Sequence, residues 1–179
     1  MKASKKCTHN FSYLYLLFKM IRITPSLFIY EQIKNLISYQ LSLTLEEVNQ
    51  LIPFNIEIER SKKTKRIRYI YLEDELWGII RPNDGFFLLT PNSAKLLIKT
   101  LQYPKLRVVV QSDIAEYIQK GRNVFAKHVL DCDPSIYPAA EIIVVNEKDL
   151  PLAIGKALLT KEEMLTFKEG IAVKVRKGI

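Results

Sequence analysis

The chain has 179 residues, with 27 Lys and Arg against 19 Asp and Glu and a formal net charge of +8. Its 48% hydrophobic and 26% charged residues are an ordinary globular balance, which argues against a disordered or fibrous chain. Two cysteines, Cys7 and Cys132, exclude a disulfide framework and a four-cysteine zinc site. The longest apolar run, at 11–18, is less than half of the roughly 20 residues that cross a bilayer. We therefore expect a basic cytoplasmic protein whose charge suits a nucleic-acid partner.

Residues 1–18 resemble an export signal only because basic residues come first and an apolar run follows. A small-residue cleavage site is missing, since Lys19, Met20, Ile21 and Arg22 come next. We interpret 1–20 as an N-terminal extension, with Met20 a possible start.

Residues 21–104 predict a small α+β domain. Apolar residues at helical spacing follow Ser26, and Thr44 with Glu47 predicts a capping box for a helix that Pro53 ends. The period then changes to two, which predicts strands at 55–60, 67–72, 75–80 and 86–89. Asn83-Asp84-Gly85 is a strong hairpin signal, and Thr90-Pro91 predicts the start of another helix.

Residues 105–179 predict a second domain with many short strands and two short helices. The first helix follows Ser112 and stops at Gly121; the second follows a capping box of Thr160 and Glu163 and ends at Gly170. Strands are expected at 106–110, 123–125, 141–145, 152–159 and 171–176. This pattern favours a mixed β pseudo-barrel, so the predicted fold class is α+β with two domains.

Three runs of the second part, at 120–129, 141–159 and 160–178, together resemble a PUA domain. The subtype is similar to the C-terminal module of archaeal tRNA-guanine (archaeosine) transglycosylases. The segment from about residue 55, with IRPNDGFFLLT at 80–90, resembles the small domain before it. The resemblance implies RNA binding. It does not extend to the catalytic barrel or the cysteine-rich zinc site of those enzymes, so we expect no enzyme activity, cofactor, metal or small-molecule substrate.

The turn at Gly121 is the first candidate RNA contact. A glycine lets phosphate approach backbone N–H groups, and Lys120 and Arg122 add charge, although a plain helix end fits the same residues. In PUA domains this turn lines the RNA groove, so the resemblance favours the RNA interpretation. In the strand at 171–176, alternation predicts that Lys174 and Arg176 face away from the core, which fits a groove wall or a solvated sheet face.

The densest basic cluster lies on the predicted hairpin between 60 and 68, where no acid interrupts six cations. It fits phosphate binding or a merely solvated loop, and phosphate contacts would carry no sequence specificity. Tyr69, Tyr71, Trp77 and Phe125 offer stacking surfaces, with core packing as the alternative. The full candidate RNA-binding set is Arg60, Lys62, Lys63, Lys65, Arg66, Arg68, Lys120, Gly121, Arg122, Asn123, Phe125, Lys127, Lys174 and Arg176.

Catalytic and metal sites find little support. Cys132 has His128 as a conceivable base, but no third orienting group or glycine-rich oxyanion loop accompanies them. Cys7 and His9 lie about 120 residues away, so a zinc site shared with Cys132 and His128 is disfavoured. We interpret Cys132 as a buried or incidental residue of a loop.

Three functions compete. The first is a tRNA-binding accessory subunit that grips the acceptor stem and 3′ end for a separate transglycosylase chain. The second is a PUA protein of ribosome biogenesis or translation, which would prefer rRNA. The third makes the chain itself an RNA-directed enzyme through Cys132, His128 or Asp131. The resemblance favours the first, with no membrane partner.

Overall fold

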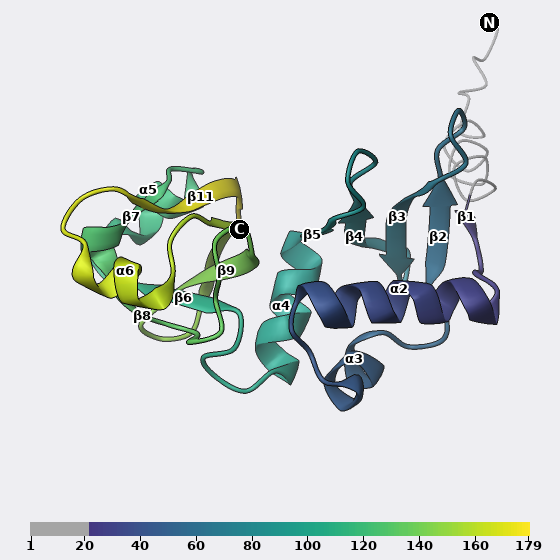
Figure 1. Cartoon of the computed structure of the whole chain (residues 1–179), viewed down its shortest axis with the longest axis horizontal. Helices are drawn as coiled ribbons and strands as arrows, with labels where there is room; N and C mark the ends of the chain where they lie inside the picture. Colours follow the sequence, from purple (N-terminus) through teal and green to yellow (C-terminus); the bar gives the residue numbers. More distant parts are fainter. Residues whose placement is uncertain (1–21) are drawn as a thin grey trace, which may run out of the picture.

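The computed structural model describes residues 22–179 (Figure 1), so the expected extension at 1–20 lies outside the described residues. Residues 22–104 form an antiparallel sheet and three helices. In chain order the elements are β1 (Arg22–Ile23), α2 (Leu27–Gln40), α3 (Leu45–Leu51), β2 (Glu57–Arg60), β3 (Ile67–Leu72), β4 (Glu75–Ile80), β5 (Phe87–Leu89) and α4 (Pro91–Thr100).

The helices begin where the sequence predicts them. The Thr44 hydroxyl accepts a hydrogen bond from the Glu47 N–H and the Glu47 carboxylate accepts one from the Thr44 N–H, which completes the capping box of α3. Thr90 exchanges the same pair of bonds with Ser93 at the start of α4. None of the helices within 22–179 is both long and apolar enough to span a membrane.

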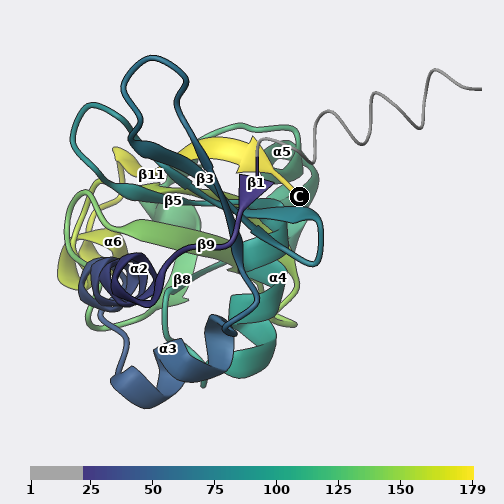
Figure 2. The same ribbon diagram turned by 90° about the vertical axis from the view of Figure 1, so that its right-hand side faces the viewer.

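The sheet has the strand order β1-β2-β3-β4-β5. Its register aligns Ile58, Ile70, Gly78 and Leu89 across four strands on one face. Figure 2 shows α2, α3 and α4 on one side of these strands, and the aligned isoleucines and leucine are at most 1% exposed. Tyr69 and Tyr71 alternate with Ile70, so they lie half-buried on the opposite face.

Residues 105–179 form a nearly closed mixed β barrel, which confirms the predicted α+β fold class. The strand order is β7-β11-β10-β9-β6-β8, and only the β6–β9 pair is parallel. The elements are β6 (Arg107–Val110), the 3₁₀ turn η1 (Ser112–Ile114), α5 (Ala115–Gln119), β7 (Val124–Phe125), the 3₁₀ turn η2 (Ala126–His128), β8 (Val129–Cys132), β9 (Glu141–Asn146), β10 (Pro151–Ala157), α6 (Lys161–Thr166) and β11 (Ile171–Gly178).

Three expectations for this part were wrong. Cys132 lies in the strand β8 and not in a loop. This strand has only four residues, which is too short to show a periodic pattern in the sequence. The helix α6 ends at Thr166, because Phe167 takes extended backbone, and Gly170 belongs to the later turn into β11. The alternation that places Lys174 and Arg176 away from the core puts Ala172 on the same face, but a register shift between Ile171 and Val173 leaves Ala172 fully buried.

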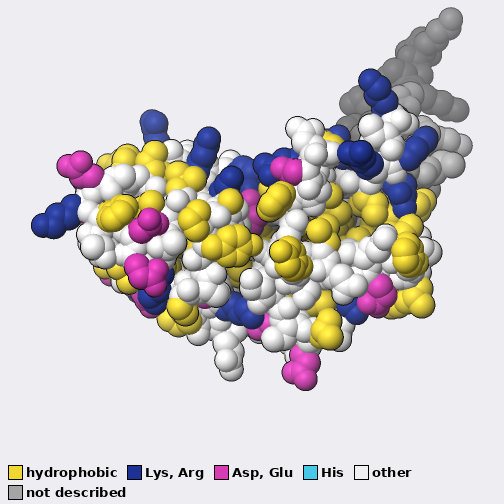
Figure 3. Space-filling model, in the orientation of Figure 1, with side chains coloured by type: hydrophobic (Ala, Val, Ile, Leu, Met, Phe, Trp, Pro, Cys, Tyr) yellow, Lys and Arg dark blue, Asp and Glu magenta, His cyan; other side chains and the backbone are white. Residues whose placement is uncertain are grey.

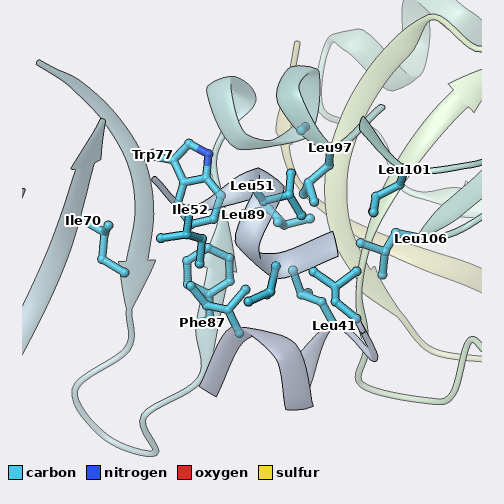
Figure 4. Close-up of a cluster of buried hydrophobic side chains, with 14 of the residues drawn as sticks. Leu41, Leu51, Ile52, Ile70, Trp77, Phe87, Leu89, Leu97, Leu101 and Leu106 are labelled. Atoms are coloured by element: carbon cyan, nitrogen blue, oxygen red, sulfur yellow. The ribbon is translucent and has the colours of Figure 1, made fainter. Parts of the chain in front are cut away.

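The two parts share a hydrophobic cluster. Leu97 and Leu101 of α4 pack in the same cluster as Leu106, Ile143 and Ile154. Figure 4 shows this cluster continuing from Trp77 and Phe87 through Leu97 and Leu101 to Leu106. The barrel has its own second cluster, formed largely by β8, β9, β10 and β11.

Candidate nucleic-acid interface

The basic hairpin β2–β3 carries six cations, and none of them lies within ion-pair distance of a carboxylate in residues 22–179. Its connection is closed by the Ser61 N–H, which donates to the Arg66 carbonyl at 2.8 Å. The Arg60 guanidinium donates to the Lys65 carbonyl at 2.9 Å, which holds that side chain over the loop. Lys62, Lys63 and Lys65 are exposed. Positive charge is therefore left uncompensated here.

The neighbouring β4–β5 hairpin is joined to the basic hairpin through Arg66, which donates to the Pro82 carbonyl at 3.0 Å. Arg81 adds a further cation that the sequence reasoning missed. Its guanidinium donates to Asp84 at 2.8 Å, and this bond lowers the pKa of the Asp84 carboxyl below its usual range. Both side chains are exposed to solvent, so the ion pair is weak and Arg81 can still contact an anion beside the basic hairpin.

The turn at Gly121 has the expected geometry. Gly121 lies at φ +87°, a conformation that favours glycine, and its N–H donates to the Ile118 carbonyl at 2.9 Å as α5 ends. A side chain built at Gly121 would meet no atom within 4 Å, so the turn is open on that side. Lys120 pairs weakly with Glu116 at 3.7 Å, where both side chains are exposed, whereas Arg122 has no ion-pair partner among the described residues.

Asn123 faces the protein rather than solvent. Its side-chain oxygen accepts a hydrogen bond of 3.1 Å from the Val175 N–H, which fastens the turn to β11. Lys174, next to Val175, is exposed on the same strand. The structure therefore brings together the Gly121 turn and Lys174.

Phe125 and Lys127 line a pocket of about 340 Å³ at the other end of the β7–β11 pair. Phe125 is 47% exposed, so its ring is available for contact, unlike Trp77 at 3%. Lys168 also lines this pocket and was missed, since a lone lysine between α6 and β11 has no pattern to mark it. The pocket combines an aromatic face with two cations and one carboxylate, that of Glu169.

Arg176 has a different environment from the other candidates. Its guanidinium donates to both Glu141 oxygens, at 2.6 and 2.7 Å, and to the Leu89 carbonyl at 2.8 Å. Glu141 in turn accepts a bond of 3.1 Å from the Leu89 N–H. Because β5 is the edge strand of the first sheet, this pair satisfies both backbone groups of Leu89 and joins the two parts of the chain.

The candidate groups lie along one long edge of the molecule. In Figure 1 the β2–β3 and β4–β5 connections, β11 and α5 all lie toward the top. Figure 3 shows Lys and Arg side chains gathered along the same edge, on both sides of a hollow between the two parts. A polyanion lying along this edge would meet cations from both parts.

Cys132 is not placed as a nucleophile. It is fully buried, and burial raises the pKa of its thiol to about 11, so the neutral thiol dominates at pH 7. His128 Nδ1 lies 3.0 Å from the Gln111 side-chain oxygen. Asp131 accepts a hydrogen bond from Lys161 at 2.9 Å, which lowers the pKa of its carboxyl. Within residues 22–179 no group of three His, Cys, Asp or Glu side chains is arranged to hold a metal ion, and Cys7 and His9 lie outside them.

Two family models match successive parts of the chain. Residues 31–104 match the patch-forming domain C2 of tRNA-guanine transglycosylase, and residues 106–179 match the PUA domain.

Curated relatives are called tRNA-guanine(15) transglycosylase. The protein from Methanosphaera stadtmanae is 47% identical over 122 residues, which are 68% of this chain and 18% of the relative. The protein from Methanococcus maripaludis strain C7 is 35% identical over 158 residues, 88% of this chain and 24% of the relative. The chain thus spans about a fifth to a quarter of the length of these relatives.

Among solved structures, a hypothetical protein from Pyrococcus horikoshii OT3 superimposes with a TM-score of 0.71 at 25% identity. The match covers 88% of this chain and 94% of that one. A PUA-domain protein from Thermoplasma acidophilum shares the fold, with a TM-score of 0.62 at 18% identity. Two family models match in succession, and the transglycosylases are 35–47% identical over the aligned residues. The chain therefore contains a C2 patch-forming domain and a PUA domain and is homologous to the C-terminal part of archaeal tRNA-guanine(15) transglycosylase.

Proposed function

We propose that this protein binds tRNA, with the acceptor stem along the basic edge and the 3′ end beside the Gly121 turn. The observation that carries the proposal is the set of β2–β3 hairpin cations that have no carboxylate partner within residues 22–179. The hairpin lies along the same edge as α5 and β11 (Figure 1), and Arg122 and Lys174 of the PUA domain are exposed. Lys and Arg side chains without carboxylate partners attract phosphates most strongly, because no internal ion pair has to be broken first.

The two basic regions have different expected roles. Hairpin cations would contact phosphates, which positions an RNA without reading its sequence. The PUA contacts surround an open turn, Lys174 and the pocket at Phe125, where an unpaired base has a ring to stack on. Recognition of a single-stranded end would therefore belong to the PUA domain, and the hairpin would supply affinity.

The finer part of the proposal is that the chain is a non-catalytic accessory subunit for a separate archaeosine transglycosylase chain. It is supported by the homology to the C-terminal portion of those enzymes and by the buried, protonated Cys132 thiol. Affinity purification from native cells should recover a transglycosylase chain, and adding the protein should raise that chain's activity on tRNA. If the transglycosylase chain neither copurifies nor becomes more active, the accessory role is excluded, whereas the proposed RNA binding is unaffected.

A second function deserves its own test. A solved protein from Pyrococcus horikoshii matches this chain over 94% of its own length, so the same two-domain arrangement also occurs as a separate protein. An independent PUA protein would not depend on a transglycosylase chain, and a role in ribosome biogenesis or translation, with rRNA as the partner, is the alternative proposal. Cosedimentation with ribosomal subunits, in preference to binding free tRNA, would select it.

The primary experiment is fluorescence anisotropy with a tRNA, with and without its 3′ CCA, across a salt series. If four hairpin cations contact phosphates, log affinity should fall with log salt with a slope of about −3 to −4. Lys62→Ala with Lys63→Ala should reduce the slope by about 1.5 to 2. Lys148→Ala, an exposed lysine in the β9–β10 turn, is the matched control and should leave the slope unchanged.

Removal of CCA should weaken binding if the 3′ end occupies the Gly121 region, and Arg122→Ala should abolish that difference. Equal affinity for both tRNAs would end the acceptor-end model. An unaltered slope in the double lysine variant would show that the hairpin does not contact RNA.

A further inference from the structure

A cleft of about 500 Å³ lies between the C2 and PUA domains, apart from the Gly121 turn and the Phe125 pocket. One wall is the outer face of β4, with Leu76 and Ile79, and the other is formed by Ile154 of β10 and by β11. Its volume falls in the range of about 300–1,000 Å³ typical of small-molecule sites. The cleft is therefore large enough for one nucleotide.

The charge of the cleft has a single sign. No Asp or Glu lines it, and Arg176 and Lys177 do. The Arg176 guanidinium is committed to Glu141 and Leu89, whereas Lys177 is exposed and has no ion pair among the described residues. An anionic group entering the cleft would meet Lys177 without displacing a carboxylate.

The polar groups of the cleft suit the edge of a base. Asn92, in the first turn of α4, uses its amide nitrogen only in a long 3.5 Å contact with the Leu76 carbonyl. Its side-chain oxygen accepts no hydrogen bond from the described residues. An amide with a nearly unused donor and acceptor, set between aliphatic walls, is the arrangement that recognises the hydrogen-bonding edge of an inserted base.

The position of the cleft favours RNA over other anions. β11 runs from the Phe125 pocket past Lys174 to Lys177, so the cleft lies on the same strand as the PUA contacts. On the other side it adjoins the C2 sheet that carries the basic hairpin. A strand of RNA bound by both domains must cross their junction.

We propose that this interdomain cleft receives one unpaired nucleotide of the bound RNA. The base lies against the aliphatic side chains of Leu76 and Ile79, Asn92 contacts its edge, and Lys177 contacts the adjoining phosphate. The proposal rests on the RNA-binding function proposed above and gives that function a third, interdomain contact.

The test compares a labelled single-stranded RNA hexamer with a blunt RNA duplex of the same length. Ile79→Trp fills the cleft without altering charge, and Leu88→Trp, at the residue that pairs with Ile79 on β5, places an indole on the same sheet face outside the cleft. We expect Ile79→Trp to weaken hexamer binding by about fivefold or more, as the loss of one stacked base would. Duplex affinity should be unchanged, and Leu88→Trp should bind like the unaltered protein.

Lys177→Ala provides a second variant that does not depend on repacking the sheet, with Lys148→Ala as its control. It should weaken the hexamer by a factor of two or more, and titration of ¹⁵N-labelled protein with the hexamer should shift the amide signals of Leu76, Ile79 and Lys177. Hexamer affinities within twofold of the unaltered protein for both variants, with no amide shifts at the cleft, would overturn the proposal.

The two proposals fail in distinguishable ways. If the cleft variants bind normally while Lys62→Ala with Lys63→Ala still weakens RNA binding, the RNA-binding function stands and the cleft site falls. If the unaltered protein binds neither tRNA nor the hexamer, both fall.

Discussion

The Arg176–Glu141 pair allows a direct test of what holds the two domains together. Arg176→Met keeps a long aliphatic side chain and removes the guanidinium, and with it three donated hydrogen bonds. It leaves the Glu141 carboxylate, whose side chain is 8% exposed, without a cation and the Leu89 carbonyl without its donor. The change should therefore destabilise the joint between the domains.

The magnitude follows from burial. Removing one partner of a buried ion pair costs about 3–5 kcal/mol, because the other charge is left uncompensated. The Arg176 side chain is 33% exposed, so water reaches the site and the lower figure, about 3 kcal/mol, applies. For a chain of this length a loss of that size lowers the Tm by about 6–12 °C.

Urea unfolding and thermal melting measure this loss. Lys174→Met, two residues earlier on β11, removes an exposed cation that has no ion pair among the described residues and should change the free energy of unfolding by less than about 0.5 kcal/mol. Adding Glu141→Gln to Arg176→Met should recover a large part of the loss, since a neutral amide can still accept from the Leu89 N–H. If Arg176→Met is as stable as Lys174→Met, the pair does not join the domains.

The same two variants decide whether Arg176 contacts RNA, as the sequence led us to expect. A side chain committed to Glu141 and Leu89 should add nothing to the salt dependence of tRNA binding. We expect Lys174→Met to reduce the slope of log affinity against log salt by about 0.9. Arg176→Met should leave this slope unchanged, under conditions where both variants remain folded. The reverse result would return Arg176 to the RNA-binding set.

Local patterns predicted the fold well because local chemistry determines where most elements begin. The capping boxes at Thr44 and Thr160 satisfy backbone N–H groups through residues three positions away, so both can be recognised in the sequence alone. The glycine turn after α5 was predictable for the same reason, since the left-handed conformation of Gly121 follows directly from a helix end.

The contacts between domains were not predictable in the same way. Alternation indicates which face of β11 Arg176 lies on, but Glu141 is 35 residues away and Leu89 is 87 residues away. Only the assembled sheets bring them together. Arg81 and Lys168 were missed because single charged residues carry no periodic signal, and their value as candidates comes from the hairpin and pocket beside them.

Two further predictions concern Cys132 and Lys65. Burial raises the pKa of the Cys132 thiol from 9.0 to about 11, so the reactive thiolate is about a hundredfold rarer at pH 8. Alkylation of this thiol, followed by mass spectrometry of its peptide, should therefore be about a hundredfold slower in the folded protein than in urea. Equal rates would contradict the burial of the thiol. The stability that the neutral thiol provides is complete below pH 9 and is lost as the pH rises through about 11. Lys65, at φ +58°, occupies the position in the β2–β3 connection that Gly85, at φ +76°, occupies in the β4–β5 connection, and both connections are closed by the same two backbone hydrogen bonds. Because a side chain in the left-handed region costs about 1–2 kcal/mol and the greater freedom of glycine in the unfolded chain offsets part of that, Lys65→Gly should stabilise the protein by up to about 1 kcal/mol in urea unfolding. The same variant should reduce the salt slope of tRNA binding by about 0.9, so stability and RNA affinity must change in opposite directions. If Lys65→Gly is more stable and its salt slope is unchanged, Lys65 is solvated and makes no phosphate contact. If the variant loses both stability and tRNA affinity, the geometry of the loop itself positions the other cations.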